Sequence, residues 1–292
     1  MWGFHDRLLT LRTALCTFLT HGRAVQAIYR RWRWQAAAQN SQSGLGLTEA
    51  EWEEEWNSVL RLASAEPRAT PHATTKRRSR LSTVSVDDDL DPLYESLEEV
   101  HVLALAHVLR RPIIVVADTV LKDAFGEALA PIPFGGIYLP LEVASSDCDH
   151  CPLLLTYDSG HFSALVSMQT PPSLTALPTI IPVTDSEHGL LPIQFAVDPG
   201  PGLDWARVEQ SPSMLAQLAL QDGEQIGLLK EYLDLVQVSH KDWASCTLFF
   251  LCVNQNVDGI DVKMCIPSHS RVTMNAGTEI YRDVLPSAEN IC

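Results

Sequence analysis

One histidine stands where a protein can use it as a base. A turn of Asp-Ser-Gly precedes His161, and polar and apolar residues then alternate as far as Met168. This pattern predicts that His161 is the first residue of a strand and lies on the face opposite Phe162. A histidine on a rigid element beside a loop can act as a general base. On spacing alone, an exposed strand-end histidine without a chemical role is the commoner case.

None of the seven cysteines is placed to work with this histidine. A nucleophilic thiol needs a lowered pKa, commonly from a helix N-terminus or a nearby cation, and access to substrate. Cys16 falls within an amphipathic helix, where a small buried thiol is expected. Cys148 and Cys151 lie on a loop before His161. With His150 they make half of a zinc signature, but no second pair follows at a suitable spacing, so we expect neither a metal nor a cofactor.

Composition narrows the class of protein. The chain has 292 residues, a net charge of −15 and 46% hydrophobic residues, enough for a substantial core. The acidic balance argues against nucleic acid as the main partner. No signal peptide and no apolar run long enough to span a membrane is present, so we expect a protein of a reducing compartment, cytoplasmic and also nuclear if the basic run at 76–80 is a nuclear signal. A solvated loop explains that run as well.

The first part of the chain predicts three helices. Asp6 is expected to cap the first, and Thr48 with Glu51 forms a capping box at the start of the third. The second contains Trp32, Trp34 and four arginines. Arginine with interleaved tryptophan can bind nucleic acid, but we expect the tryptophans to pack inward while the arginine head groups remain in water.

The middle of the chain predicts a buried sheet. Residues 66–91 read as a loop, and a helix is expected from Asp91-Pro92 to Arg111 with His101 and His107 packed inside. The continuous apolar run at 113–117 is typical of a central strand covered on both faces, and 137–141 and 153–157 supply further strands. A helix is expected over about 214–236. Helices followed by a small mixed sheet indicate an α/β (α+β) class.

These segments resemble the OTU family of cysteine deubiquitinases, its A20-like branch and, most closely, the Cezanne proteins. The matching blocks run from Glu98 to Asp118, from Ala130 to Leu141 and from His161 to Met168. The likeness implies a papain-like OTU fold with a small mixed sheet between helical regions. It divides the chain into an OTU domain over 1–243, with a disordered insert at 66–91 and a C-terminal part at 171–243 with a long helix, and a tail of unknown function over 244–292 that an alternative C-terminus would explain.

The resemblance also implies a function. OTU enzymes cleave ubiquitin from proteins with a papain-like Cys–His pair, and His161 matches the catalytic histidine. Many place an acidic or amide residue two positions after it, where this chain has Ser163, so the group that orients the imidazole is left open. The implied activity is a ubiquitin thioesterase or isopeptidase that acts on polyubiquitin chains, with an atypical lysine linkage preferred, and on ubiquitinated proteins. Neither nucleic acid nor a membrane is an expected partner.

The family nucleophile is missing from the printed sequence. It lies in an Asp-Gly-Asn-Cys motif that occurs nowhere in these residues, so we expect an N-terminally truncated OTU domain without its nucleophile helix. Loss of that helix should uncover apolar surface around Ile113–Val116. The alternative function is a catalytically inactive fragment that binds ubiquitin or another partner.

Overall fold

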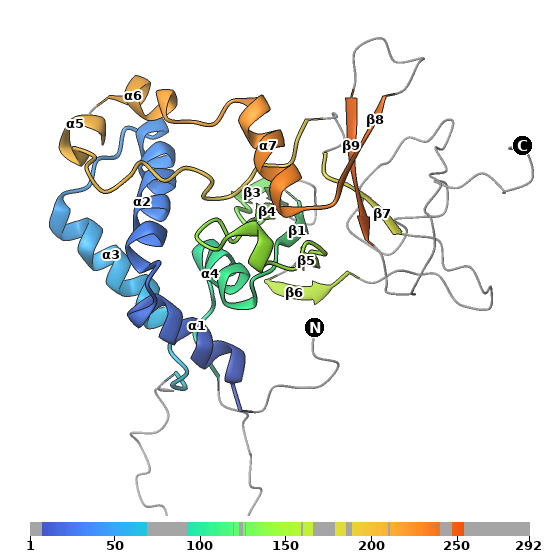
Figure 1. Cartoon of the computed structure of the whole chain (residues 1–292). Helices are drawn as coiled ribbons and strands as arrows, with labels where there is room; N and C mark the ends of the chain where they lie inside the picture. The colour runs from blue at the N-terminus through green and yellow to red at the C-terminus, as the bar shows by residue number, and fades with distance from the viewer. Residues whose placement is uncertain are drawn as a thin grey trace, which may run out of the picture.

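The computed structural model describes residues 8–68, 93–118, 120–122, 125, 127–158, 160–165, 179–184, 189–209, 211–239 and 247–253. In the strands at 179–182, 236–239 and 247–253 only the backbone is described. The helices are α1 (Thr10–His21), α2 (Val25–Gln42), α3 (Glu49–Leu62), α4 (Glu99–Leu109), α5 (Trp205–Glu209), α6 (Pro212–Gln217) and α7 (Asp222–Tyr232). In Figure 1 the first three helices lie beside a central sheet, and α7 lies near a second sheet.

The central sheet has four strands in the order β4-β1-β5-β6. They are β1 (Ile113–Ala117), β4 (Gly136–Tyr138), β5 (Leu153–Asp158) and β6 (His161–Ala164). β1 and β5 are parallel and the other two pairs are antiparallel, so the sheet is mixed, as the sequence predicted. A separate hairpin joins β2 (Val120–Lys122) to β3 (Ala128–Pro131).

Strand β1 is covered on both faces. Ile113 and Val115 belong to a core built mainly by α1, α3 and α4. Ile114, between them, belongs to a second core that contains Leu229 and Tyr232 of α7. All three β1 residues are at most 1% exposed. The predicted central strand is therefore confirmed, and the expected apolar surface at Ile113–Val116 is wrong for these three residues because helices cover both faces.

The predicted helix starts are confirmed in part. Thr48 and Glu51 form the capping box of α3. Asp6 and the pair Asp91-Pro92 lie outside the described residues, and α4 begins at Glu99 rather than at Pro92. The imidazole of His101 accepts a hydrogen bond from the backbone N–H of Glu98 at 2.8 Å. This bond caps the N-terminus of α4, so the helix starts after Glu98.

The long helix expected over 214–236 is wrong. Two helices, α6 and α7, replace it, and a strand, β8 (Leu235–Ser239), follows them. The break has a local cause, because Gln221 and Glu224 form a capping box that starts a new helix. β8 pairs with β9 (Thr247–Val253), which also pairs with β7 (Thr179–Pro182). The predicted domain boundary at 243/244 lies outside the described residues.

The two buried arginines of α2 also contradict the sequence prediction that their head groups remain in water. Arg31 bonds Glu142 at 2.8 Å, and Arg33 bonds Glu49 at 2.6 Å and Glu209 at 2.8 Å. The Arg33 side chain is 2% exposed and lies over the ring of Trp205. Burial lowers the pKa of Arg33, but the hydrogen bonds from its guanidinium to the two carboxylates more than offset this and raise the pKa above its ordinary value. Charge pairing thus makes burial possible.

Within the described ranges, no helix combines the length and the apolar content that a membrane crossing requires.

We expect Arg33→Ala to destabilise the chain by about 3 kcal/mol, because it leaves the largely buried carboxylate of Glu209 without its cation. Denaturant unfolding followed by circular dichroism measures this. Arg68→Ala is the matched control, since it breaks the exposed pair with Glu95 and should change stability little. Equal unfolding midpoints for the two variants would contradict the prediction.

Candidate active site

The structure places His161 at the end of the central sheet. It is the first residue of β6 and is exposed, as the sequence predicted. The turn before it contains Gly160 at φ +83°, a conformation that glycine adopts without strain. Residues 166–168, predicted to continue the strand, lie outside the described residues, and β6 ends at Ala164. The imidazole is therefore held on a sheet edge and open to solvent.

An aromatic cluster supports this end of the sheet. The ring of Phe134 lies 4.3 Å from that of Tyr157 and 5.1 Å from that of Phe162, measured between centroids. Tyr157 and Phe162 are also cross-strand partners, 4.9 Å apart. Such pairs stabilise a sheet beyond the area that they bury. The cluster fixes the backbone next to His161 and leaves the histidine on the other face.

The register of the β5–β6 hairpin brings the carboxylate of Asp158 next to His161. From the sequence, Asp158 was interpreted only as a turn residue. Asp158 is the direct cross-strand partner of His161, and Thr156 is that of Ser163. Directly opposite residues share a face, with Cβ atoms about 4.5–5.5 Å apart. Asp158, His161 and Ser163 therefore lie on one face. A two-residue turn between alternating strands was the signal that could have identified this pair.

The described cysteines lie elsewhere. Cys16 packs part-buried against the core on α1, as expected. Cys148 and Cys151 precede the first residue of β5, whereas Asp158, beside His161, is its last. That strand places them about 15 Å or more from His161 at 3.3 Å per residue. Burial and then the charge of Asp147 raise the pKa of the Cys148 thiol, which opposes an activated thiolate.

The loop around Cys148 forms no metal site with its neighbours. His150 contacts the carbonyl oxygen of Ser145 at 3.0 Å and lies 3.7 Å from the carboxylate of Asp234. Among the residues that the structure describes, no group of three or more histidine, cysteine or acidic side chains is arranged to hold a metal ion.

His101 and His107 are packing residues, as the sequence predicted. Both are at most 3% exposed. The ring of His107 bonds the carbonyl oxygen of Leu103 and accepts the backbone N–H of Glu142, and burial lowers its pKa to about 4. The imidazole of His107 is therefore neutral near pH 7. Its hydrogen bond with Glu142 also holds in place the loop residue that pairs with Arg31.

Two comparisons with known proteins found similar sequences. The family model described as OTU-like cysteine protease matches residues 18–162, a span that includes His161. The matched residues make up just under half of the chain, and they are similar to OTU-like cysteine proteases. It is 33% identical over 270 residues to tumor necrosis factor alpha-induced protein 3 of Mus musculus and 30% identical over 271 residues to that of Homo sapiens. Each match covers 83% of this chain but only 32% or 31% of the relative, so the chain spans about a third of their length.

An apolar groove of about 320 Å³ lies over the face of the sheet that carries Phe162, and His161 is not among its lining residues. Its walls come from α4, β5 and β6 and include Leu105, Leu155 and Phe162. Phe162, next to His161, is 38% exposed, and Leu105 and Leu155 are only half-buried. Partly exposed apolar side chains therefore lie over β5 and β6.

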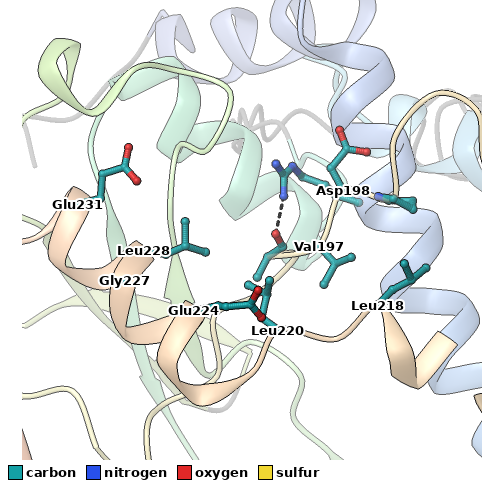
Figure 2. Close-up of a pocket in the computed structure, with 11 residues that line it drawn as sticks. Val197, Asp198, Leu218, Leu220, Glu224, Gly227, Leu228 and Glu231 are labelled. Carbon is teal, nitrogen blue, oxygen red and sulfur yellow. Dashed lines mark hydrogen bonds between the residues drawn. The ribbon is translucent and has the colours of Figure 1, made fainter. Parts of the chain in front are cut away.

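A second, larger cleft of about 640 Å³ lies elsewhere, lined by α2, residues 196–199 and the region from α6 to α7 (Figure 2). Arg31 donates to the carbonyl oxygen of Ala196 on its wall at 2.6 Å. Glu224 and Glu231 of α7 contribute carboxylates. None of its lining residues belongs to β5 or β6, so it has no part in chemistry at His161.

We expect Phe134→Ala to cost about 3 kcal/mol of stability, because the 9%-exposed ring loses its packing against Tyr157 and Phe162. Thermal and denaturant unfolding measure the loss. Phe125→Ala is the matched control, since that ring is 92% exposed and little packing is removed. The prediction is wrong if both variants unfold at the same midpoint.

Proposed function

We propose that this chain carries the histidine part of a deubiquitinase site, and that His161 is its general base. The observation that carries the proposal is the place of His161. It lies exposed on the first residue of a strand, inside the span matched by the cysteine protease model, and the next residue, Phe162, lines an apolar groove. The reaction is hydrolysis of the thioester or isopeptide bond that joins the C-terminal carbonyl carbon of ubiquitin to its leaving group.

The reaction needs a thiol that these residues do not supply. In the proposed mechanism, a segment with the family motif Asp-Gly-Asn-Cys packs in the groove lined by α4, β5 and β6. Because β6 is an edge strand, the segment passes this open edge to bring its thiol to the face of His161. His161 takes the thiol proton, the thiolate attacks the ubiquitin carbonyl, and the same proton passes to the leaving amine. Water then attacks the acyl-enzyme thioester, and the thiol is released.

Asp158 is proposed to orient the imidazole. A third group normally holds the catalytic histidine in the productive tautomer. Asp158 sits directly across the hairpin from His161 on the same face, and an ionised carboxylate can accept a hydrogen bond from the ring N–H. Ser163 lies on that face also but two register positions further along, so Asp158 is the better-placed group.

Finer features of the proposal rest on the family resemblance. They are a closer kinship with the Cezanne proteins, a preference for an atypical lysine linkage, ubiquitinated proteins as substrates, and a cytoplasmic and nuclear location. The competing function is a non-catalytic ubiquitin-binding module. The absence of an Asp-Gly-Asn-Cys motif from the printed sequence favours it for this chain in isolation.

The chain in isolation should form no covalent adduct with a ubiquitin that carries a C-terminal electrophile. Cys16 is partly buried against the core, Cys148 and Cys151 precede the far end of β5, and the pKa of the Cys148 thiol is raised by burial and by Asp147. Intact mass spectrometry after incubation measures adducts, and peptide mapping locates them. An adduct at Cys16, Cys148 or Cys151 would overturn the view that the nucleophile comes from another segment.

A chimera tests the role of His161. Joining a segment with the Asp-Gly-Asn-Cys motif from an OTU enzyme in front of residue 1 should give hydrolysis of ubiquitin dimers. In this chimera His161→Ala should lower kcat by about 10²–10⁴, because the thiol loses its base. Folding should be retained, since the side chain is exposed. The rates are measured by quantifying released ubiquitin, with circular dichroism as the control for folding.

Two neighbouring substitutions separate orientation from general effects. Asp158→Asn should lower kcat more than it changes KM, while Ser163→Ala should leave kcat within about twofold of the parent. Near-parental activity of the folded His161→Ala chimera would contradict the assignment of His161 as general base. The non-catalytic ubiquitin-binding module would then be the remaining hypothesis.

A further inference from the structure

The segment 192–195 lies against β4 at the edge of the central sheet. Ile137 of β4 donates its N–H to the carbonyl oxygen of Pro192 at 2.9 Å and accepts the N–H of Gln194 at 2.9 Å, the bonding pattern of a parallel pair. Gly136, at φ +133°, has no room for a side chain, because a Cβ atom there would lie 2.5 Å from the same carbonyl oxygen. The segment is therefore fixed closely against the strand.

Two glutamine side chains, the amide pair Gln35 and Gln194, connect this segment to α2 and to the loop before β4. Oε1 of Gln35, on α2, accepts the N–H of Phe195 at 2.6 Å, and its Nε2 donates to Oε1 of Gln194 at 2.8 Å. Nε2 of Gln194 donates to the carbonyl oxygens of Gly135 at 2.7 Å and Pro133 at 3.3 Å. A backbone N–H at one end and two carbonyls at the other allow only one orientation of both amides.

The backbone of Phe195 is held in an uncommon conformation by these contacts. Its φ of +56° lies in the left-handed region, which a residue with a Cβ atom rarely adopts. Such conformations persist where the surroundings impose them, and they are concentrated at functional sites. The N–H of Phe195 is bound by Gln35, its carbonyl oxygen is bound by Arg31 at 3.2 Å, and its side chain is buried. The amide pair thus contributes to a geometry that the segment alone would not favour.

The loop that the amide pair holds carries the ring that supports the β5–β6 hairpin. Phe134 lies between the two bound carbonyls, and its own carbonyl oxygen accepts the hydroxyl of Tyr138 at 2.8 Å. Three successive carbonyls of this loop therefore accept side-chain hydrogen bonds. The ring of Phe134 contacts those of Tyr157 and Phe162 in the hairpin. Because Phe162 directly follows His161, a shift of this loop would reach the histidine.

We propose that Gln194 is a positioning residue for His161, with Gln35 as its support on α2. The inference rests on the proposed function, because it concerns the same histidine. Gln194 acts through the loop before β4 rather than on the reacting atoms. Its amide fixes the loop, the loop fixes the ring of Phe134, and the ring fixes the hairpin that must hold the imidazole at a defined angle.

Imidazole ¹H–¹⁵N correlation spectra of the unmodified chain test this inference without a nucleophile. Gln194→Met keeps the length of the side chain and removes its amide hydrogen bonds. We expect one dominant neutral tautomer of His161 in the parent and a mixture of tautomers in the variant, because the hairpin is less fixed. Gln225→Met is the matched control, since it removes a glutamine bond to the carbonyl oxygen of Leu220 outside the amide pair and should leave the His161 signals unchanged.

A second variant separates the bonds to the loop from the bond to α2. In Gln194→Glu the carboxylate can still accept from Gln35, but it cannot donate to the two loop carbonyls. It should therefore disturb His161 as Gln194→Met does, and the retained bond guards against misfolding. In the active chimera both variants should lower kcat about tenfold and change KM by less than about twofold, because a misplaced base slows the chemical step.

The outcomes separate the two proposals, with circular dichroism as the control for folding. Parental His161 signals or parental kcat in a folded Gln194 variant would overturn the positioning role and leave the proposed function intact. A His161→Ala chimera as active as its parent would overturn the proposed function and the positioning role with it. A tautomer change and a loss of kcat in the Gln194 variants, both absent from Gln225→Met, support the inference.

Discussion

The burial of β1 on both faces is the constraint on which the rest of the structure depends. Its side chains alternate between a core under α1, α3 and α4 and a core under α7. Because a one-residue slip would exchange these faces, the register of β1 with β5 is strongly specified. That register sets where β5 ends, and the tight turn after it sets His161. His161, the residue proposed as general base, is thereby positioned by a buried strand two places away in the sheet.

Charge pairing joins α2 to two loops and to two other helices. Arg30 and Arg31 bond Asp198 and Glu142, and Arg33 joins α2 to α3 and α5. The partners lie up to 176 residues apart. Buried pairs of this kind contribute little net stability compared with apolar packing, but each is costly to break, so they select one arrangement of the helices. They explain how a chain with a net charge of −15 packs arginines inside.

The features that depend only on neighbouring residues in the chain could be predicted from the sequence. The α3 capping box, the continuous apolar run of β1 and the strand that opens at His161 were all readable from the sequence. The buried arginines were not, because their carboxylate partners are far along the chain. The break between α6 and α7 was missed because the leucine spacing continues across a capping box at Gln221. Asp158 was read as a turn residue because its role depends on hairpin register, and the family resemblance, not periodicity, singled out His161.

The central claim is that His161 is held ready for a thiol carried by a segment that packs in the groove lined by α4, β5 and β6. A crystal structure of the chimera with an Asp-Gly-Asn-Cys segment measures this directly. The account predicts that the segment fills the groove against Leu105, Leu155 and Phe162, with the cysteine sulfur within about 4 Å of an imidazole nitrogen of His161. A folded chimera in which the segment packs elsewhere and the thiol lies beyond reach of His161 would contradict it.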